Sequence, residues 1–120
     1  MTQEEKELLL KDLCARLPYG VKVRINTKNN YYTAIVCEIT RNYICVEGGG
    51  EICFSHDSYK PYLRPMSSMT VEEQKEYFEK WGLDGWNVDT FDWLNKHHFD
   101  YRGLIPIGLA LEALEKMYIL

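Results

Sequence analysis

Apolar positions near the start of the chain recur at three- and four-residue spacing, which is typical of a helix with one buried side. That side would hold Leu9, Leu10, Leu13, Cys14 and Leu17. Thr2 precedes Glu5 by three positions, so a hydroxyl and a carboxylate can cap each other's backbone N–H groups where the helix begins. The sequence PYG at 18–20 predicts its end.

From Val21 the apolar positions alternate with polar ones, which predicts a half-buried strand over 21–26. Further β-branched runs at 31–40, 43–47 and 51–55 are separated by the turn sequences NTKNN, RN and GGG. These runs predict an antiparallel meander. With a two-residue turn at Arg41-Asn42 and a loop at 48–50, the core face would hold Ile35, Cys37, Ile39, Ile44, Val46, Ile52 and Phe54. The same register makes Cys45 and Cys53 cross-strand neighbours.

The second half of the chain predicts helices. The segment 56–69 contains two prolines and is expected to be irregular. Thr70 and Glu73 repeat the capping pattern and begin a helix that runs to about Trp81. Its inward stripe would hold Val71, Gln74, Tyr77, Phe78 and Trp81. Asp89 with Asp92 can begin a third helix, whereas the tail 106–120 fits a strand and a helix equally well.

The order of these elements predicts one α+β domain over residues 1–120. It would consist of an N-terminal helix, an antiparallel β-meander and C-terminal helices packed on the sheet. A meander of this length can also curl toward a small SH3-like barrel. The composition agrees with a folded chain, because 46% of the 120 residues are hydrophobic and 27% are charged.

Charge is unevenly distributed along the chain. The net charge is −4, with −1 in residues 1–20, +2 in 21–65 and −5 in 66–120. An acidic C-terminal half argues against extended contacts with nucleic-acid phosphates, which require a basic face. No apolar run reaches the length of a membrane span, and the N-terminus has no signal-peptide pattern, so we expect a cytoplasmic protein with no membrane partner. The four cysteines are expected to be reduced thiols.

Three segments, KELLLKDLCARLPYGV, PYLRPMSSMT and DWLNKHHFDYRGLIPIGLALEA, resemble a family of small uncharacterised proteins encoded by phages, prophages and mobile elements of gut bacteria. The family has no assigned activity, so the resemblance transfers no catalytic or binding residue. It implies an accessory role in phage or mobile-element biology. Family members usually have Pro and Gly near positions 114 and 116, where this chain has Leu114 and Lys116, and this difference permits a longer terminal helix.

The segment FDWLNKHHFDYRGLI, residues 91–105, has the highest density of groups capable of chemistry. A hydrolase or nuclease could use His97 or His98 as a general base oriented by Asp92 or Asp100. Separations of five and six residues, however, place Asp92 on a different helix face from either histidine. We therefore favour a structural interpretation, in which one histidine packs at a helix C-terminus and Asp100 caps the next turn.

A metal site is a second hypothesis, because Cys53 and His56 form a C-x-x-H pair and Cys45 is expected beside Cys53. His97 or His98 would supply the fourth ligand. The spacing lacks the paired C-x-x-C motifs of zinc fingers, and buried cysteine is a common core residue. We therefore expect no metal and no other cofactor. The same spacing gives Cys53 no cationic neighbour that would activate it as a nucleophile.

Two binding hypotheses remain. Weak nucleic-acid binding would use a basic and aromatic sheet face, comprising Lys22, Arg24, Lys28, Arg41, Tyr31 and Tyr32, with Tyr43 as a further stacking residue. Binding of a protein partner, or of a second copy of the chain, would use exposed aromatic residues, with Trp86, Tyr59 and Tyr62 as candidates. We favour a non-catalytic protein-interaction module, with nucleic-acid binding as the alternative and catalysis third.

Overall fold

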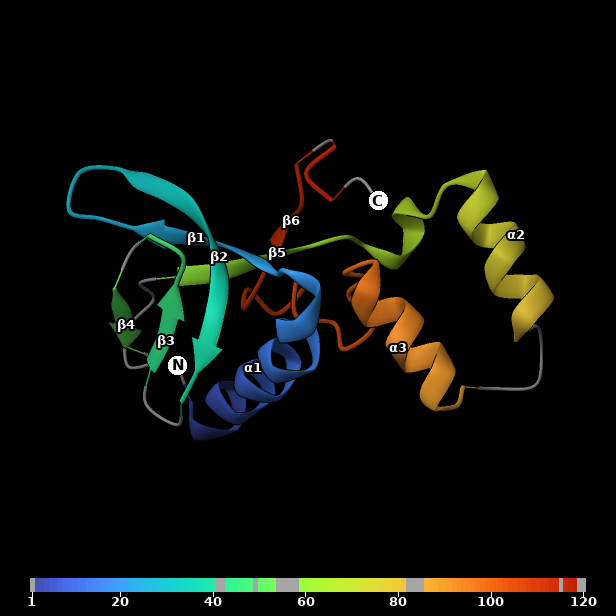
Figure 1. Ribbon diagram of the computed structural model, residues 1–120, viewed down its shortest axis with the longest axis horizontal. Coiled ribbons are helices and arrows are strands. Elements are labelled where there is room, and N and C mark those ends of the chain that lie inside the picture. Colours follow the sequence, from blue (N-terminus) through green and yellow to red (C-terminus); the bar gives the residue numbers. More distant parts are fainter. Residues whose placement is uncertain are drawn as a thin grey trace.

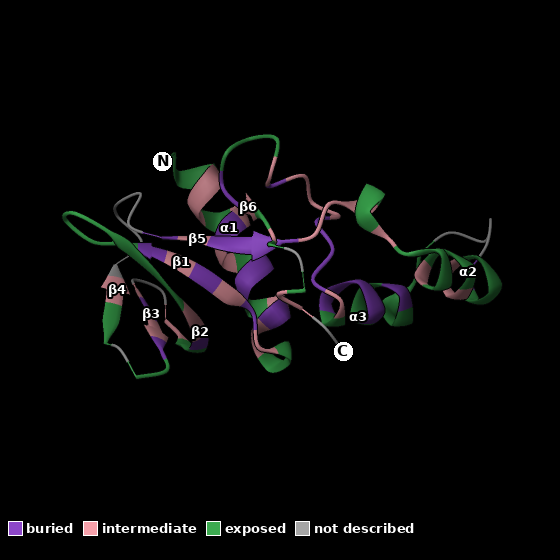
Figure 2. Cartoon of the chain, turned by 90° about the horizontal axis from the view of Figure 1, so that it is seen from above, coloured by how far each residue is buried: buried purple, intermediate pink, exposed green. Residues whose placement is uncertain are grey.

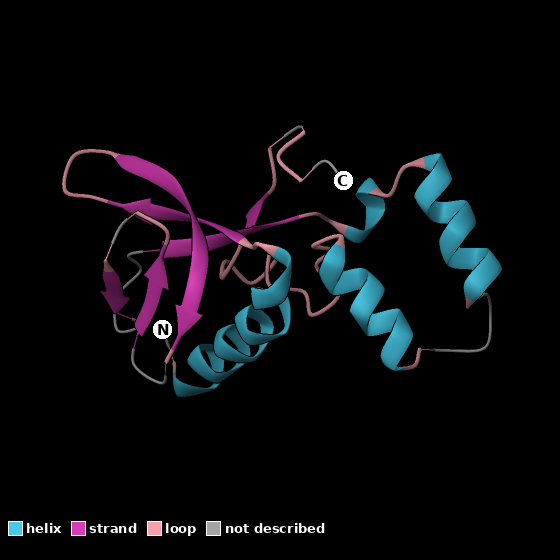
Figure 3. Cartoon of the chain, in the orientation of Figure 1, coloured by secondary structure: helices cyan, strands magenta, loops and turns pink. Residues whose placement is uncertain are grey.

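The computed structural model describes residues 2–40, 43–48, 50–53, 59–81, 86–114 and 116–118, with the side chain of residue 53 left out. It confirms the predicted α+β class: an N-terminal helix, a six-stranded and mostly antiparallel sheet, and two further helices. Strands gather in one half of the molecule and the helices α2 and α3 in the other (Figure 3). The helix α1 lies against the sheet, and its C-terminal end comes close to α3 (Figure 1).

Helix α1 spans Gln3–Arg16 and begins with the predicted capping box. Thr2 Oγ1 accepts the Glu5 N–H at 3.1 Å, and Glu5 Oε1 accepts the Thr2 N–H at 3.0 Å. Leu9 and Leu13 are buried as predicted, but Cys14 is exposed. Asp12 and Arg16 are buried on the same helix, which the apolar pattern did not predict. The helix ends in a short 3-10 turn, Leu17–Tyr19, and Gly20 takes the left-handed φ of 70° that closes it.

The strands are β1 (Lys22–Asn26), β2 (Tyr31–Ile39), β3 (Tyr43–Val46), β4 (Glu51–Cys53), β5 (Tyr59–Leu63) and β6 (Leu111–Glu112). They are ordered β4-β3-β2-β1-β5-β6. The meander β1 to β4 is antiparallel as predicted, β5 returns antiparallel to β1, and β6 is parallel to β5. Over the described residues β4 and β6 do not pair with each other. The sheet is therefore open rather than a closed SH3-like barrel.

The predicted register between β2 and β3 is correct at Glu38–Cys45 and Ile39–Ile44 and wrong beyond Glu38. A β-bulge lies between Val36 and Glu38, so Val36 pairs with Val46 and Ile39 with Ile44. The extra residue reverses the alternation, and Val36 is buried while Cys37 is exposed. Ile35 and Ile39 are partly exposed. Phe54 and the Arg41-Asn42 turn lie outside the described residues.

The prediction of an irregular segment over 56–69 is wrong for residues 59–63, which form strand β5. This strand contains Pro61, a residue that usually argues against a strand. Pro61 pairs with Val23 of β1. The Val36 N–H donates to the Val21 carbonyl at 3.1 Å, so alternate residues of β1, including Val23, direct their backbone groups toward β2. The β1–β5 ladder therefore needs no N–H from residue 61, which is the position where a strand tolerates proline.

Helix α2 spans Val71–Lys80 and has the predicted capping box of Thr70 and Glu73. Its predicted stripe is only partly correct, because Val71 and Phe78 are 81% and 62% exposed and Gln74 is exposed. Helix α3 spans Val88–Lys96 and is capped by Asn87 and Thr90, not by the predicted pair Asp89 and Asp92. Buried residues are concentrated in the sheet, α1 and α3, while α2 carries mainly exposed and half-buried residues (Figure 2).

Over its described residues, 106–114 and 116–118, the tail forms neither the long helix nor the long strand that the sequence allowed. After the two residues of β6 it turns back through residues 116–118 toward β1 and β5. The Tyr118 hydroxyl accepts the Lys22 backbone N–H at 2.8 Å and donates to the Tyr62 carbonyl at 2.8 Å. Continuing the β1–β5 register would place Lys22 opposite Tyr62. The tyrosine hydroxyl therefore replaces a strand–strand hydrogen bond where the two strands separate.

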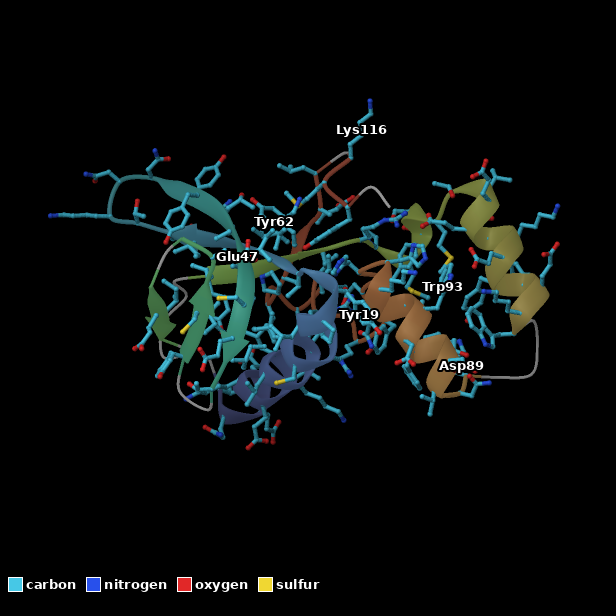
Figure 4. The ribbon with its side chains drawn as sticks, in the orientation of Figure 1. Tyr19, Glu47, Tyr62, Asp89, Trp93 and Lys116 are labelled. Carbon is cyan, nitrogen blue, oxygen red and sulfur yellow. The ribbon has the colours of Figure 1, made fainter. Side chains whose placement is uncertain are left out.

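Two hydrophobic clusters stabilise the fold. The larger joins α1, the sheet and residues 104–110. The smaller is aromatic and joins the two C-terminal helices, with Trp81, Trp93, Leu94 and Phe99 buried. Trp93 lies on the side of α3 that faces α2 (Figure 4), and its ring centroid is 5.7 Å from that of Trp81.

Candidate functional site

The segment with the most reactive groups, residues 97–105, closes helix α3. The Phe99 N–H donates to the Leu94 carbonyl at 2.9 Å and the His98 N–H to the Asn95 carbonyl at 3.0 Å. These two bonds define a Schellman motif, which satisfies carbonyl groups at the end of a helix. His98 occupies the position that usually holds glycine, and its φ is 60°. A non-glycine residue in this conformation must be held there by its side chain.

The His98 side chain is buried between the end of α1 and the tail. Its Nε2 lies 3.0 Å from the Tyr19 carbonyl, so the proton of the neutral ring is on Nε2. The ring stacks on Tyr118 with a centroid distance of 3.9 Å. Burial lowers the pKa of His98 to about 4, assisted by the charge of Arg16. The imidazole is therefore neutral near pH 7 and joins two chain segments rather than facing solvent.

Asp100 is buried and its carboxylate contacts backbone. Oδ1 accepts the Leu104 N–H at 2.8 Å and Oδ2 accepts the Ile105 N–H at 2.9 Å. This agrees with a capping role for Asp100 in the turn that follows α3. Because both oxygens are engaged by the backbone, Asp100 is not placed to orient His97 or His98 as a general base.

His97 belongs to a different cluster, centred on Glu73 of α2. Arg64 donates to both Glu73 oxygens, at 2.8 and 2.6 Å, and His97 Nδ1 lies 3.2 Å from Glu73 Oε2. Burial raises the pKa of Glu73, but the hydrogen bonds from Arg64 and Thr70 outweigh it and hold the pKa at about 2. Burial lowers the pKa of His97 despite the nearby Glu73 charge.

The Glu73 cluster lies beside a hollow of about 620 Å³ between α2 and the tail. Its lining combines acidic, basic and apolar side chains, and its charged side chains and its histidine are Glu72, Glu73, Glu76, Glu112, Arg64, Lys116 and His97. The Glu73 carboxylate is held by a bidentate arginine and by the helix cap. An acid held ionised in this way stabilises the start of α2 and is a poor proton donor.

A second charged cluster joins α1 to the segment after α3. Arg16 Nε and Nη2 donate to the two Asp12 oxygens at 2.8 and 3.1 Å, and Arg16 Nη2 also donates to the Phe99 carbonyl at 2.6 Å. Arg102 Nε donates to Asp12 Oδ1 at 3.2 Å. Asp12 and Arg16 were not identified from the sequence, although their four-residue spacing on a helix was a visible signal. Arg102 therefore joins the segment after α3 to α1, and its Nη2 also donates to the neighbouring Tyr101 hydroxyl at 2.9 Å.

The metal hypothesis does not agree with the strand register. Cys45 pairs with Glu51, and Cys53 pairs with Tyr43, so the two cysteines are not direct neighbours as predicted. His56 lies outside the described residues. His97 and His98 contact Glu73 and Tyr19 in the other half of the fold. In the described part of the chain no three His, Cys, Asp or Glu side chains are grouped to hold a metal ion.

The proposed basic residues are only partly available. Lys22 Nζ donates to the Met117 carbonyl at 2.9 Å and is engaged by the tail. Arg24 is bonded to Asn26, and its guanidinium lies 4.6 Å from the Tyr31 ring centroid. Lys28, Tyr31 and Tyr32 are exposed at the β1–β2 hairpin, whereas Arg41 lies outside the described residues. Lys60 lies opposite Arg24 in the register and was missed, because β5 was not predicted.

The three predicted partner-binding residues separate into two groups. Tyr59 and Tyr62 are 1% and 5% exposed, so they belong to the interior and do not form a surface. Burial raises the pKa of Tyr59. Trp86 is 43% exposed. Its ring packs edge-on against Phe91 and Tyr101, with centroid distances of 5.4 and 6.0 Å.

We call Trp86, Phe91 and Tyr101 the aromatic patch. Phe91 is 39% exposed, and its ring centroid is 5.4 Å from that of Tyr101. The Trp86 indole N–H also donates to the Tyr77 hydroxyl, which ties the patch to α2. Asp92, next to Phe91 in α3, is exposed, whereas Asp89 lies with Lys80, Trp81 and Trp93 around a separate hollow. The Arg102 guanidinium lies 4.8 Å from the Tyr101 ring centroid, and its Nη2 donates to the Tyr101 hydroxyl at 2.9 Å. The patch therefore has both an acidic and a basic neighbour.

A comparison with known protein families, curated proteins and solved structures finds no match to this chain. Within the described ranges, no helix is long and apolar enough to cross a bilayer.

Proposed function

We propose that the protein is a non-catalytic interaction module that binds a protein partner through the aromatic patch. One observation carries this proposal: Trp86 and Phe91 are exposed and yet are held in place by ring contacts, edge-on between Trp86 and both other rings and tilted between Phe91 and Tyr101. Isolated exposed apolar residues are common, but clustered and preordered aromatic rings are typical of binding hot spots.

The charge of this half of the chain indicates the charge expected on the partner's surface. Asp92 is exposed next to Phe91, and residues 66–120 carry a net charge of −5. A complementary surface would present an apolar centre with lysine or arginine at its rim. We therefore propose a partner with a basic, apolar surface, encountered in the cytoplasm. The resemblance to phage and mobile-element proteins supports an accessory role of this kind.

The catalytic alternative has weaker support. Asp100 is bonded to backbone, His98 is buried and neutral, and Glu73 is held ionised by Arg64. Nucleic-acid binding has less support from the structure than from the sequence, because the Lys22 side chain is engaged by the tail. None of these contacts involves a residue of the aromatic patch.

The experiment captures partners with the tagged protein from cells of its source, with and without nuclease treatment, and then measures each purified partner by calorimetry. Trp86→Ala should weaken binding by roughly 30-fold, the effect of losing a hot-spot residue. The matched control is Ile107→Ala, since Ile107 is a 52% exposed apolar residue outside the patch. It should bind as the wild type does.

Two results would overturn the proposal. One is a partner that is lost with nuclease, which would indicate nucleic-acid binding. The other is a nuclease-resistant partner that binds Trp86→Ala and the wild type equally. If capture yields only further copies of the chain, the same pair of variants is compared by sedimentation, and Trp86→Ala should dissociate the oligomer.

A further inference from the structure

Strand β2 has one edge that is only half covered. Its first part, Tyr31–Ile35, pairs with β1, whereas β3 pairs only from Val36 onward. The β1–β2 hairpin consequently extends beyond β3 and β4 (Figure 1). Among the described residues, no strand pairs with Tyr31, Tyr32, Thr33 or Ala34 on the side away from β1.

The backbone direction at this edge follows from the hydrogen bonds on either side of it. Val36 N–H donates to Val21 of β1, and the Asn30 carbonyl accepts the Thr27 N–H at 2.7 Å across the hairpin. The backbone N–H and carbonyl groups of the even-numbered residues of β2 thus face β1. Those of Thr33 face the opposite side, which is the free edge. The Ile35 carbonyl accepts the Glu47 N–H at 2.9 Å, which confirms this alternation where β3 begins to cover the edge.

We propose that an extended, acidic segment of a partner protein adds to β2 at Tyr31–Ile35 as a further strand. In such strand addition, main-chain hydrogen bonds supply affinity and side-chain sites beside the edge supply specificity. The edge residues are β-branched, aromatic or small, and none of the five is charged. The charges and prolines that commonly prevent pairing at exposed edges are therefore missing from these five positions.

The charge near this edge is positive. The Arg24 guanidinium lies over the Tyr31 ring of β2, with 4.6 Å to the ring centroid, while its Nε donates to Asn26 of β1 at 3.2 Å. Lys60 is the cross-strand neighbour of Arg24, and Lys28 is exposed in the hairpin turn. Residues 21–65 carry a net charge of +2 in an otherwise acidic chain. Carboxylates on an added strand would be attracted to Arg24 and Lys28, whereas Lys60, on β5 beyond β1, contributes only through its longer-range field.

A hollow of about 470 Å³ lies beside the same residues. It is lined by Lys22, Thr33, Ala34, Ile35, Leu114 and Met117, and most of this lining is apolar. Leu114 is 62% exposed, so the tail presents an open apolar wall to this hollow. The hollow would accept an apolar side chain of the added strand, at a position that alternates with its carboxylates.

This surface is distinct from the aromatic patch, which lies on α3 in the other half of the fold, so either proposal can fail without the other. The experiment selects binders from a displayed library of random peptides about twelve residues long, a length that spans a strand edge. The baits are the wild type, Thr33→Pro and the double variant Arg24→Glu/Lys60→Glu. The charge-matched control is Lys11→Glu, because Lys11 is exposed on α1.

The expected result is a set of peptides with excess Asp and Glu that bind the wild type and Lys11→Glu. Thr33→Pro removes the outward N–H, and the double variant removes the cations, so both should bind at least about tenfold more weakly, the cost of one lost backbone or charge contact. A synthetic copy of an enriched peptide should also slow amide hydrogen exchange at Thr33 in the wild type.

Circular dichroism first checks that Thr33→Pro is folded. If Thr33→Pro is unfolded, the double variant Arg24→Glu/Lys60→Glu still tests the proposal. The proposal is overturned if no peptide is enriched on the wild type, or if the enriched peptides lack acidic residues. It is also overturned if they leave Thr33 exchange unchanged. Binding of a single-stranded oligonucleotide that depends on Arg24 and Lys60 but not on the Thr33 N–H would assign the face to nucleic acid instead.

Discussion

The guanidinium of Arg16 donates a 2.6 Å hydrogen bond to the carbonyl of Phe99, across 83 positions of sequence. Arg16 is fully buried, and its charge is matched by Asp12 one helical turn earlier. This contact connects α1 to the turn that follows α3. The cluster of polar residues at 97–105 therefore acts largely as a joint between the two halves of the fold.

Arg16→Met should lower the free energy of unfolding by about 3 kcal/mol, because it leaves a buried carboxylate with a single remaining cation. Urea unfolding followed by tryptophan fluorescence measures this change. Lys11→Met is the control, since Lys11 is exposed on the same helix, and it should stay within about 0.5 kcal/mol of the wild type. A loss below about 1 kcal/mol for Arg16→Met would show that the joint contributes little.

Tyr118→Phe should cost about 1–3 kcal/mol, because it removes the hydroxyl that joins the Lys22 N–H to the Tyr62 carbonyl. Hydrogen exchange at the Lys22 amide should become faster in the same variant. Tyr31→Phe is the matched control, because the Tyr31 ring is 56% exposed. Equal stability of Tyr118→Phe and the wild type would mean that the tail does not support the β1–β5 pairing.

At position 98 the backbone conformation and the side chain have opposite effects on stability: the positive φ disfavours a non-glycine residue, whereas the contacts of the histidine ring are stabilising. The φ of 60° favours glycine, so His98→Gly should be more stable than His98→Ala by about 1 kcal/mol. Both variants should be less stable than the wild type, because they lose the bond to Tyr19 and the stack on Tyr118. Thermal unfolding of the three proteins gives the order. A glycine variant more stable than the wild type would contradict a structural role for the ring.

The depressed pKa of His98 predicts a dependence of stability on pH. The unfolded chain binds the proton near the ordinary pKa of 6.5, whereas the folded chain binds it only near pH 4. Stability from this group is therefore complete above about pH 6.5 and is lost as the pH falls toward 4, by up to about 3 kcal/mol. Urea unfolding from about pH 8 to about pH 4 measures this loss, and His98→Asn should show a flatter profile. A pKa near 6.5 for the His98 imidazole of the folded protein, measured by NMR, would contradict this prediction.

Glu73→Gln should release the start of α2, because the neutral amide loses its charge-assisted bonds with Arg64. We expect a loss of about 1–3 kcal/mol. Exchange at the amides of α2 should become faster while the sheet stays protected. Glu72→Gln is a close control, since Glu72 is the exposed neighbour in the same first turn. Equal exchange in both variants would show that Arg64 does not anchor the helix.

Local signals in the sequence predicted local structure well. Thr2 with Glu5 and Thr70 with Glu73 marked two helix starts correctly, since a capping box involves only four consecutive residues. The alternation of Val21, Val23 and Ile25 also predicted a buried strand face correctly. The α+β class followed from the order of these elements.

The remaining errors involve contacts between distant residues. Pro61 argued against a strand, and only its position opposite Val23 makes β5 possible. The bulge at Val36 and Glu38 moved Cys37 to the surface, and no pattern within β2 indicates it. In the sequence, the spacing of Asp12 and Arg16 is that of an ordinary exposed helix pair. In the structure, Phe99 and Arg102 contact the pair and bury it. Burial of a charged pair depends on the partner that covers it.

The candidate site was predicted in part. The capping role of Asp100 and the packing of a histidine at the end of α3 followed from spacing and are observed. The exposure of Trp86 was predicted, but its packing against Phe91 and Tyr101 was not, because it depends on how distant residues meet in space.

We propose that the protein binds a partner through the aromatic patch, while His98 and Asp100 hold the fold together. Hydrogen exchange is therefore measured on the protein alone and with its captured, nuclease-resistant partner. We expect slower exchange at residues 86–92 and around Tyr101, with little change around the Glu73 cluster. Protection confined to the hollow beside His97, with residues 86–92 unchanged, would contradict it and return attention to the histidine segment.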